Sequence, residues 1–278
     1  MTEDHGPGTA VVTGASSGIG AEYAEQLARQ GWNLVLVARR AERLTGLARE
    51  LGESTGAAVE TVVADLAQSA DLARVAERVA AEDVALVVNN AGINGYGPFT
   101  EVDPALLVKV LDVNVTAPTV LARAALPGML ARGRGAVVNV ASLLAFAGAL
   151  PPGPLPHRAV YGGTKGYMVT FTRTLAAELA GTPVRVQVVC PGLTATEFHL
   201  TAGEAPVPGE RRVHDDGGMP AADVVTASLA ALAAGEVVCV PGLVQAEALE
   251  RLAAAEQGVR AGSGSTMAPR YRTGPDGA

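Results

Sequence analysis

Short runs of β-branched residues alternate with longer helical patterns along most of this chain. The runs are continuous and valine-rich, rather than strictly alternating between apolar and polar residues, which indicates strands buried on both faces. Alternation of such strands with helices predicts a parallel sheet that is covered by helices on each side. We therefore predict an α/β fold with a doubly wound, parallel seven-stranded sheet. The predicted strands are Thr9–Thr13, Asn33–Ala38, Ala58–Ala64, Val84–Asn89, Ala136–Ala141, Val184–Cys190 and Glu236–Val240.

The 278 residues suffice for one large domain of the Rossmann type, which we place at residues 9–261. We expect residues 1–8 to form a flexible N-terminus and the Gly/Ser/Pro-rich residues 262–278 to form a disordered tail. The long polar segment at about 193–218 is predicted to be a substrate loop. The predicted helices are Ile19–Gln30, Ala41–Leu51, Asp71–Ala81, Pro104–Arg132, Val160–Ala180 and Ala221–Ala234.

Composition and charge exclude several classes of protein. The chain is 49% hydrophobic and 18% charged, which excludes wholesale disorder, and its net charge of −7 argues against nucleic-acid binding. Cys190 and Cys239 stand among apolar, β-branched residues, so we predict buried thiols in a reducing compartment. The acidic N-terminus does not resemble a signal peptide, and the most apolar stretch, 136–150, fits a strand and loop better than a membrane span. We expect a cytoplasmic protein with no membrane association and no metal site.

A glycine-rich turn separates the first predicted strand from the first predicted helix. Gly14, Gly18 and Gly20 let the backbone turn tightly and approach a pyrophosphate, which would rest on the N–H groups of the helix start. Ser16, Ser17 and Ile19 fill the positions between these glycines. A glycine-rich turn is often only a turn, but its place between a strand and a helix predicts a dinucleotide site.

Two arginines at the end of the second predicted strand indicate which dinucleotide binds. An NAD site usually carries an acidic residue at this position to accept from the ribose 2′-hydroxyl. Here the strand ends in Arg39 and Arg40, without a carboxylate. Arginine pairs bidentately with a 2′-phosphate and would not tolerate a competing carboxylate, so we predict NADP(H) rather than NAD(H). The alternative is a pair of solvated arginines at the start of a helix.

Tyr161 and Lys165 are four residues apart in a predicted helix, which places them on one face. A neighbouring ammonium favours the phenolate and is expected to lower the tyrosine pKa from about 10 toward neutrality. Such a tyrosine can exchange a proton with a reacting oxygen near neutral pH. Taken alone, the spacing also fits a solvated lysine that packs on a ring.

Further motifs occur in a characteristic order. These are Asp65-Leu66, Asn89-Asn90-Ala91-Gly92, Asn114, Ser142 and Pro191-Gly192, together with the glycine-rich turn and the Tyr161/Lys165 pair. Over residues 9 to 240 the chain resembles the short-chain dehydrogenase/reductase family of classical type. Each motif has a structural alternative by itself: Asp65 could cap a helix and Ser142 could be a turn hydroxyl.

The resemblance implies roles for individual residues. Tyr161 would be the general acid/base, Lys165 would lower its pKa and hold the nicotinamide ribose, and Ser142 would hydrogen-bond the substrate oxygen. Asn114 would keep a water in a proton relay that starts at Lys165, and Asp65 would bond the adenine amine. The remaining implied cofactor contacts are Leu66, Asn90, Ala91, Gly92, Pro191, Gly192, Thr194 and Thr196.

The chain departs from the family pattern between Ser142 and Tyr161, where the proline-rich segment Ala147–His157 lengthens the loop at the expected substrate pocket. Gly162 and Gly163 follow the tyrosine, which indicates either a close approach to the backbone or a soft helix start. In this insertion His157 could reach the substrate, but an exposed loop histidine is the simpler interpretation.

We therefore expect an NADPH-dependent carbonyl reductase, or the reverse alcohol dehydrogenase, for a small to medium apolar ketone or aldehyde. A catalytically silent NADP(H)-binding redox sensor and an epimerase with the same tyrosine are the alternatives. The resemblance further implies a homodimer or homotetramer that forms through the helices at 104–132 and 160–180.

Overall fold

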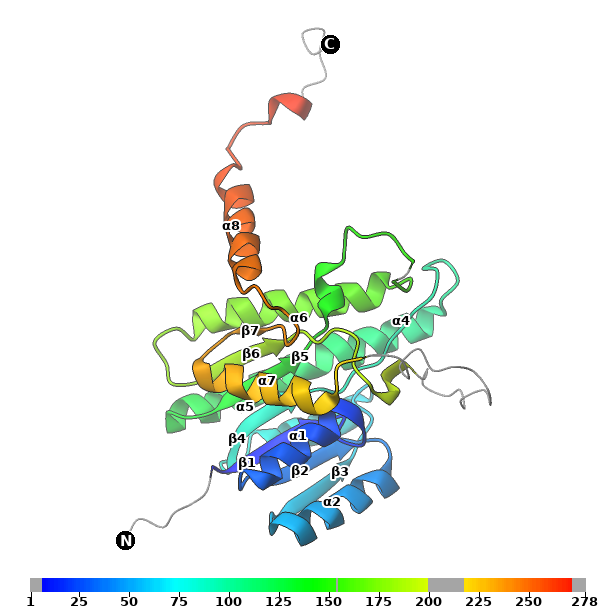
Figure 1. Cartoon of the computed structure of the whole chain (residues 1–278), viewed down its shortest axis with the longest axis vertical. Helices are drawn as coiled ribbons and strands as arrows, with labels where there is room; N and C mark the ends of the chain where they lie inside the picture. Colours follow the sequence, from blue (N-terminus) through cyan, green and yellow to red (C-terminus); the bar gives the residue numbers. More distant parts are fainter. Residues whose placement is uncertain (1–6, 154, 200–217, 272–278) are drawn as a thin grey trace. The chain divides into compact units, whose positions relative to one another are not determined.

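The computed structural model describes residues 7–153, 155–199 and 218–271, and the chain forms two compact units, Met1–Pro241 and Gly242–Ala278. The first unit contains a sheet of seven parallel strands in the order β3-β2-β1-β4-β5-β6-β7, which confirms the predicted doubly wound sheet (Figure 1). The strand order reverses at β1, so the ends of β1 and β4 flank the point at which open α/β sheets bind ligands. The strands are β1 Thr9–Thr13, β2 Asn33–Ala38, β3 Val59–Val63, β4 Val84–Asn89, β5 Ala136–Val140, β6 Arg185–Val189 and β7 Val238–Cys239.

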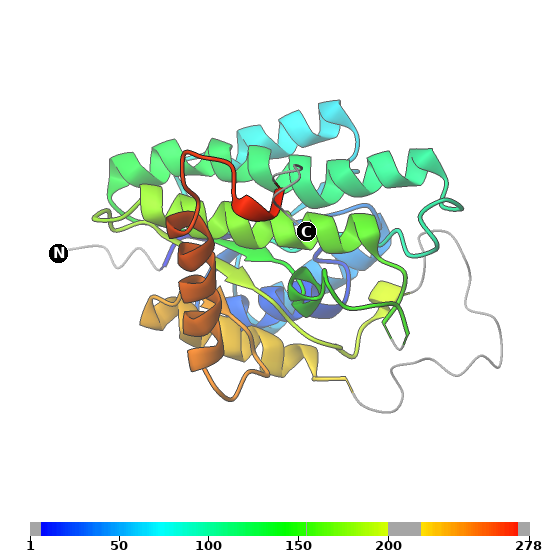
Figure 2. The same ribbon diagram turned by 90° about the horizontal axis from the view of Figure 1, so that it is seen from above.

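Helices cover both faces of the sheet. Successive residues of the central strand face opposite layers, so Val12 packs with α1, α2 and α7, whereas Val11 packs with α3, α5 and α6. Figure 2 shows α5 and α6 on one side of the sheet and α7 on the other. The helices of this unit are α1 Gly18–Arg29, α2 Ala41–Thr55, α3 Ser69–Val79, α4 Pro104–Leu111, α5 Ala117–Arg132, α6 Ala159–Glu178 and α7 Ala221–Ala234, with short turns η1 Asp112–Thr116, η2 Leu143–Phe146 and η3 Glu197–His199.

The predicted helix Pro104–Arg132 is not uniform. The helix begins at Pro104, with Asp103 as its N-cap. After α4, the backbone forms the π-helical turn η1, and α5 then continues in the α-helical form. The sequence prediction missed this turn because propensity does not distinguish a π turn from an α turn. π turns often occur at functional sites, and η1 contains Asn114.

The stretch Pro104–Arg132 is long and apolar enough to span a membrane by length and composition alone, with 39% of its most apolar window buried inside the protein. It is a different stretch from residues 136–150, the most apolar stretch expected from the sequence. Within the fold, however, α5 forms part of a helical layer, where Leu121, Ala122 and Met129 are fully buried against the sheet and α3. Core packing therefore accounts for part of the apolar character of this stretch, whereas Val108, Leu111 and Val120 remain exposed.

The second unit contains α8 (Glu247–Ala261) and the short turn η4 (Pro269–Tyr271). The sequence prediction did not include α8. The predicted domain, residues 9–261, spans the boundary between the two compact units at Pro241 and Gly242. No residue of α8 is buried. Residues 262–271 of the predicted tail are described and include η4; residues 1–6 and 272–278 lie outside the described residues.

A buried polar network joins α1, α7 and β6. The Tyr23 hydroxyl donates to Ser228 Oγ at 2.5 Å, and Ser228 Oγ donates to Gln187 Oε1 at 2.8 Å. Gln187 Nε2 donates to the carbonyl oxygens of Ser228 and Glu236. All three side chains are fully buried, and burial raises the pKa of Tyr23 well above its usual value. The network satisfies polar groups that would otherwise be costly in the core.

We predict that Ser228→Ala lowers the free energy of unfolding by about 1–3 kcal/mol, because Tyr23 and Gln187 each lose a buried hydrogen-bond partner. Urea denaturation measures the change. Thr226→Ala, on the exposed side of the same helix, is the matched control and should cost less than about 0.5 kcal/mol. Equal effects of the two substitutions would contradict the prediction.

Candidate active site

Four predicted catalytic residues come together at the carboxyl edge of the sheet. Tyr161 and Lys165 lie on one face of α6, with the Lys165 Nζ 5.5 Å from the centre of the Tyr161 ring. Ser142 follows β5 and Asn114 lies in η1. Tyr161, Lys165 and Asn114 are all at least 95% buried, so the site is shielded from bulk solvent in this structure.

Lys165 is a buried ammonium with a backbone acceptor. Its Nζ donates to the carbonyl oxygen of Val140 at 2.9 Å, where β5 ends. Burial lowers the pKa of Lys165 to about 8, and the nearby Cys190 thiol opposes that shift. The positive charge is therefore held at the end of β5 at an energetic cost.

Tyr161 has a raised pKa, whereas the sequence predicted a lowered one. Burial is the main cause, the adjacent Tyr96 adds to it, and a hydrogen bond with Ser142 acts in the opposite direction. The prediction was wrong for this state of the protein because the desolvation of the phenol outweighs the attraction of an ammonium that is itself directed at Val140. Burial thus favours the neutral phenol at Tyr161.

Ser142 connects Tyr161 to the end of β5. Its Oγ accepts from the backbone N–H of Leu144 at 3.1 Å and caps η2, and its side chain also hydrogen-bonds Tyr161. Its backbone N–H bonds Cys190. Cys190 and Cys239 are free and buried, as predicted, and burial raises their pKa values to about 12 and about 11.

The Asn114 side chain hydrogen-bonds both the loop after β4 and helix α6. Its Oδ1 accepts from the backbone N–H of Ile93 and its Nδ2 donates to the Ile93 carbonyl, both at 2.9 Å. Nδ2 also donates to Thr164 Oγ1 at 3.2 Å, and Thr164 in turn bonds the Tyr161 carbonyl. Asn114 therefore fixes the loop after β4 against the helix that carries Tyr161.

The glycine-rich turn forms a cradle at the end of β1. Gly14 has a φ of +68°, and a side chain there would lie 2.8 Å from Asn90 Nδ2, so only glycine fits. Thr13 Oγ1 accepts from the N–H groups of Asn90 and Ala91, both at 3.0 Å, which joins the ends of β1 and β4. Asn90 Nδ2 donates to the Thr13 carbonyl at 2.9 Å. The turn thus fits the close backbone approach that a pyrophosphate requires.

The other predicted cofactor contacts divide into two groups. Leu66 is buried in the core, and Ile19 and Ala91 are partly buried beside it. Asp65 is already engaged: its Oδ2 accepts from Lys109 at 3.2 Å and its Oδ1 from the Ala67 N–H at 3.1 Å. Although burial opposes the shift, these bonds hold its pKa below the usual range.

The predicted arginine fork is present but holds a carboxylate. Arg40 donates to Ser16 Oγ (2.8 Å) and to Ser17 Oγ (2.6 Å). Its Nη1 lies 3.1 Å from Glu197 Oε2, and the same oxygen lies 2.7 Å from Arg43 Nη1. This carboxylate does not belong to the end of β2, because Glu197 comes from η3, far along the chain. Arg39 is exposed.

The segment after Pro191 and Gly192 crosses the site. The Leu143 N–H donates to the Pro191 carbonyl at 2.8 Å, and Thr194 Oγ1 donates to the Gly192 carbonyl at 3.1 Å. Thr196 packs against Gly18, where an added side chain would lie 3.0 Å from the threonine methyl group. Of the predicted substrate loop 193–218, residues 200–217 lie outside the described residues.

Two aromatic rings lie next to Tyr161. The Tyr96 ring meets Tyr161 edge-on at 5.3 Å, and the Phe198 ring lies 5.7 Å from it. Burial raises the pKa of Tyr96 to about 12, with Arg158 opposing. Neither ring was predicted as a site residue, because an aromatic residue in a loop carries no motif.

Arg158 organises the proline-rich insertion. It donates to the carbonyl oxygens of Ala147 (2.7 Å), Leu150 (2.8 Å) and Pro156 (2.9 Å). The His157 carbonyl accepts from the Gly97 N–H at 3.1 Å, which ties the insertion to the loop that carries Tyr96. A Cβ added at Gly163 would meet no described atom within 4 Å outside its own stretch of helix, and one added at Gly162 would make only ordinary contacts. Close packing therefore does not account for these glycines.

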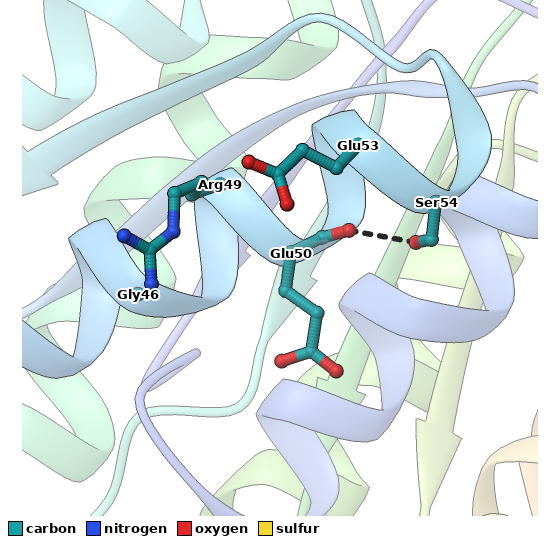
Figure 3. A pocket seen from close by; sticks show the side chains of 5 residues that line it. All are labelled: Gly46, Arg49, Glu50, Glu53 and Ser54. Atoms are coloured by element: carbon teal, nitrogen blue, oxygen red, sulfur yellow. Dashed lines mark hydrogen bonds between the residues drawn. The ribbon is translucent and has the colours of Figure 1, made fainter.

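A hollow on the outer surface of α2 lies apart from the catalytic group (Figure 3). Its lining side chains are polar: Arg49 and Glu50 are adjacent in the helix, and Glu53 follows about one turn later. None of the predicted site residues lines it. Among the described residues no cluster of three or more metal-ligating side chains occurs.

The family model for short chain dehydrogenase matches residues 8–206, so the chain belongs to the short-chain dehydrogenase family. A short-chain dehydrogenase from Sphingobium yanoikuyae, in complex with NADPH, is 36% identical and superposes with a TM-score of 0.85 over 95% of this chain and 100% of that one. A bulky-bulky ketone specific alcohol dehydrogenase from Comamonas testosteroni is 34% identical, with a TM-score of 0.83 over 96% and 99% of the two chains.

Galactitol 2-dehydrogenase (L-tagatose-forming) from Cereibacter sphaeroides is 39% identical over 71% of this chain and 75% of that protein. Two other curated relatives, from chicken and human, are 33% identical over 68% of this chain. The match spans only 56% of their length, so this chain corresponds to about half of those proteins.

We predict that the buried ammonium of Lys165 makes stability depend on pH. The pKa is about 8 in the folded protein and about 10.5 when unfolded, so between these values the unfolded state binds more protons and stability rises with pH. Relative to Lys165→Met, wild type should gain up to about 3 kcal/mol across this window. Urea denaturation of both proteins from pH 7 to 10 measures the difference.

Lys109→Met, which removes a partly exposed lysine, is the control for loss of charge. A difference between wild type and Lys165→Met that stays constant from pH 7 to 10 would contradict the prediction.

Proposed function

We propose that this protein is an NADPH-dependent carbonyl reductase or, in the reverse direction, an alcohol dehydrogenase. The observation that carries the proposal is the convergence of Tyr161, Ser142, Lys165 and Asn114 next to the glycine-rich turn. A side chain added at Gly92 would lie 3.5 Å from Lys165 Nζ and 3.4 Å from Asn114 Oδ1. Gly92, an expected cofactor contact, therefore lies beside Lys165 and Asn114.

The protonation states of Tyr161 and Lys165 suggest a role for each residue of the site. When bound, NADPH supplies the hydride. Ser142 and Tyr161, which hydrogen-bond each other, offer two hydroxyl donors to one carbonyl oxygen. Tyr161, whose burial favours the neutral phenol, delivers the proton to that oxygen, and Lys165 provides positive charge that stabilises the resulting phenolate. Asn114 maintains the position of α6 relative to the loop after β4.

The arginine cluster supports NADP(H) over NAD(H). Arg40 already bonds Ser16 and Ser17 of the glycine-rich turn, which brings a guanidinium next to the expected phosphate site. Arg43 lies within reach of the same carboxylate oxygen, so two cations share one anion position. The NADPH complex of the Sphingobium relative supports the same preference.

An apolar substrate fits the surroundings of Tyr161. Its neighbours are the rings of Tyr96 and Phe198, and the exposed side chains near the ends of β5 and β6 are Leu143, Phe146 and Leu193. The likeness to a dehydrogenase specific for bulky ketones supports a substrate with apolar groups on the carbonyl. The relative that forms L-tagatose acts on a polyol, which makes a polyol panel the informative comparison.

We predict that Tyr161→Phe lowers kcat for carbonyl reduction by at least about 100-fold, because the proton donor is lost while the buried ring is retained. NADPH oxidation with a panel of ketones, aldehydes and ketoses measures turnover, and fluorescence titration measures NADPH binding. Binding should persist. If wild type binds NADPH without turnover, and Tyr161→Phe behaves in the same way, the results would favour the redox sensor instead.

We predict that Arg40→Ala weakens NADPH binding about 10-fold or more and changes NADH binding much less, because only NADPH carries the 2′-phosphate. Fluorescence titration of both cofactors measures the ratio of their dissociation constants. Arg49→Ala, on the outer surface of the same helix, is the control (Figure 3). An equal loss for both cofactors would contradict a 2′-phosphate role.

We also infer that the protein forms a homodimer or homotetramer through the helices of one layer. Exposed apolar side chains on α4, α5 and α6 support this assembly, and light scattering of the full chain measures it. These side chains are Val108, Leu111, Val120 and Tyr167.

A further inference from the structure

Glu197 occupies the position that the proposed function assigns to the cofactor phosphate. Its Oε2 lies 3.1 Å from Arg40 Nη1 and 2.7 Å from Arg43 Nη1. Both arginines belong to the start of α2, and Arg40 also reaches the two serines of the glycine-rich turn. The two guanidinium groups therefore share one carboxylate oxygen where two cations are expected to share a phosphate.

A carboxylate and a phosphate monoester are interchangeable partners for arginine, since both accept charge-assisted hydrogen bonds from the same N–H groups. They cannot both occupy this position, because a second anion would lie against the first. The pairs are between two-fifths and half exposed, so the carboxylate can be displaced at moderate cost.

We propose that Glu197 is a built-in competitor for the cofactor 2′-phosphate and thereby sets the affinity of this protein for NADP(H). The inference rests on the proposed NADP(H) site. The 2′-phosphate must displace Glu197 from Arg40 and Arg43, which weakens phosphate binding. Cofactors without this phosphate leave the carboxylate in place.

Displacement of Glu197 also affects the surroundings of Tyr161, because the residues next to Glu197 in the chain contact the site. Glu197 is flanked by Thr196, which packs on Gly18, and by Phe198, whose ring lies 5.7 Å from that of Tyr161. The Phe198 carbonyl accepts from Asn94 Nδ2 at 3.2 Å. One short segment thus contacts the glycine-rich turn, the arginine pair and Tyr161. Release of Glu197 loosens the contact at its neighbour, so phosphate binding is coupled to the mobility of Phe198.

Isothermal titration with 2′,5′-ADP and with 5′-AMP tests the competition, because the two probes differ only in the 2′-phosphate and neither requires turnover. Glu197→Gln should bind 2′,5′-ADP about two- to fivefold more tightly than wild type does, with 5′-AMP unchanged. Glu50→Gln makes the same charge change on the outer surface of α2 and should alter neither (Figure 3). In an Arg40→Ala background the gain should shrink or vanish.

Unchanged or weaker binding of 2′,5′-ADP by Glu197→Gln would overturn the proposal, as would an equal gain for both probes. The failure of the NADP(H) assignment is distinguishable, because in that case neither wild type nor Glu197→Gln prefers 2′,5′-ADP to 5′-AMP. A preference that appears only in Glu197→Gln supports the competition.

Hydrogen exchange tests the coupling. With 2′,5′-ADP bound, the amides of Thr196 to Phe198 should exchange faster in wild type, because the probe releases Glu197 without reaching Tyr161. In Glu197→Gln these amides should already exchange fast, and the probe should change them little. Exchange that slows equally in both proteins would overturn the coupling.

Discussion

The buried ammonium of Lys165 is the constraint on which the catalytic arrangement depends. A charge at this depth is tolerated only if it finds a strong acceptor, and the carbonyl of Val140 at the end of β5 provides one. This bond fixes the position of α6 relative to the sheet, and with it the position of Tyr161 one turn earlier. The lowered pKa of Lys165 reflects the free-energy cost of burying a positive charge beside the phenol. A neutral residue at this position would avoid the cost but would also remove the positive charge.

The carboxyl edge of the sheet explains how distant residues meet. Thr13 joins the loops after β1 and β4, and Asn114 joins the loop after β4 to α6. In each case a polar side chain hydrogen-bonds backbone groups beyond the end of a strand, where these groups have no partner within the sheet. Thr13 and Asn114 therefore stabilise the loops that follow the strands and hold them beside the candidate site.

Electrostatics at the proposed phosphate site depend on a long-range contact. Arg40 and Arg43 both contact one carboxylate oxygen near the start of α2, and two cations that face the same point favour an anion there. In this structure Glu197 is that anion. The cofactor preference of such a site is a difference between two competing partners, and it cannot be read from the arginines alone.

Hydrophobic patterning and helical spacing are local properties, and they sufficed to predict the parallel sheet, the glycine-rich turn and the pairing of Tyr161 with Lys165. The π turn at Asn114 was not predicted, because residue propensity does not distinguish it from an α turn, and the exposed helix α8 was also missed. The direction of the Tyr161 pKa shift and the partner of Arg40 emerged only from the folded structure. Both depend on burial and on contacts between segments far apart in the chain, and local sequence patterns record neither of these.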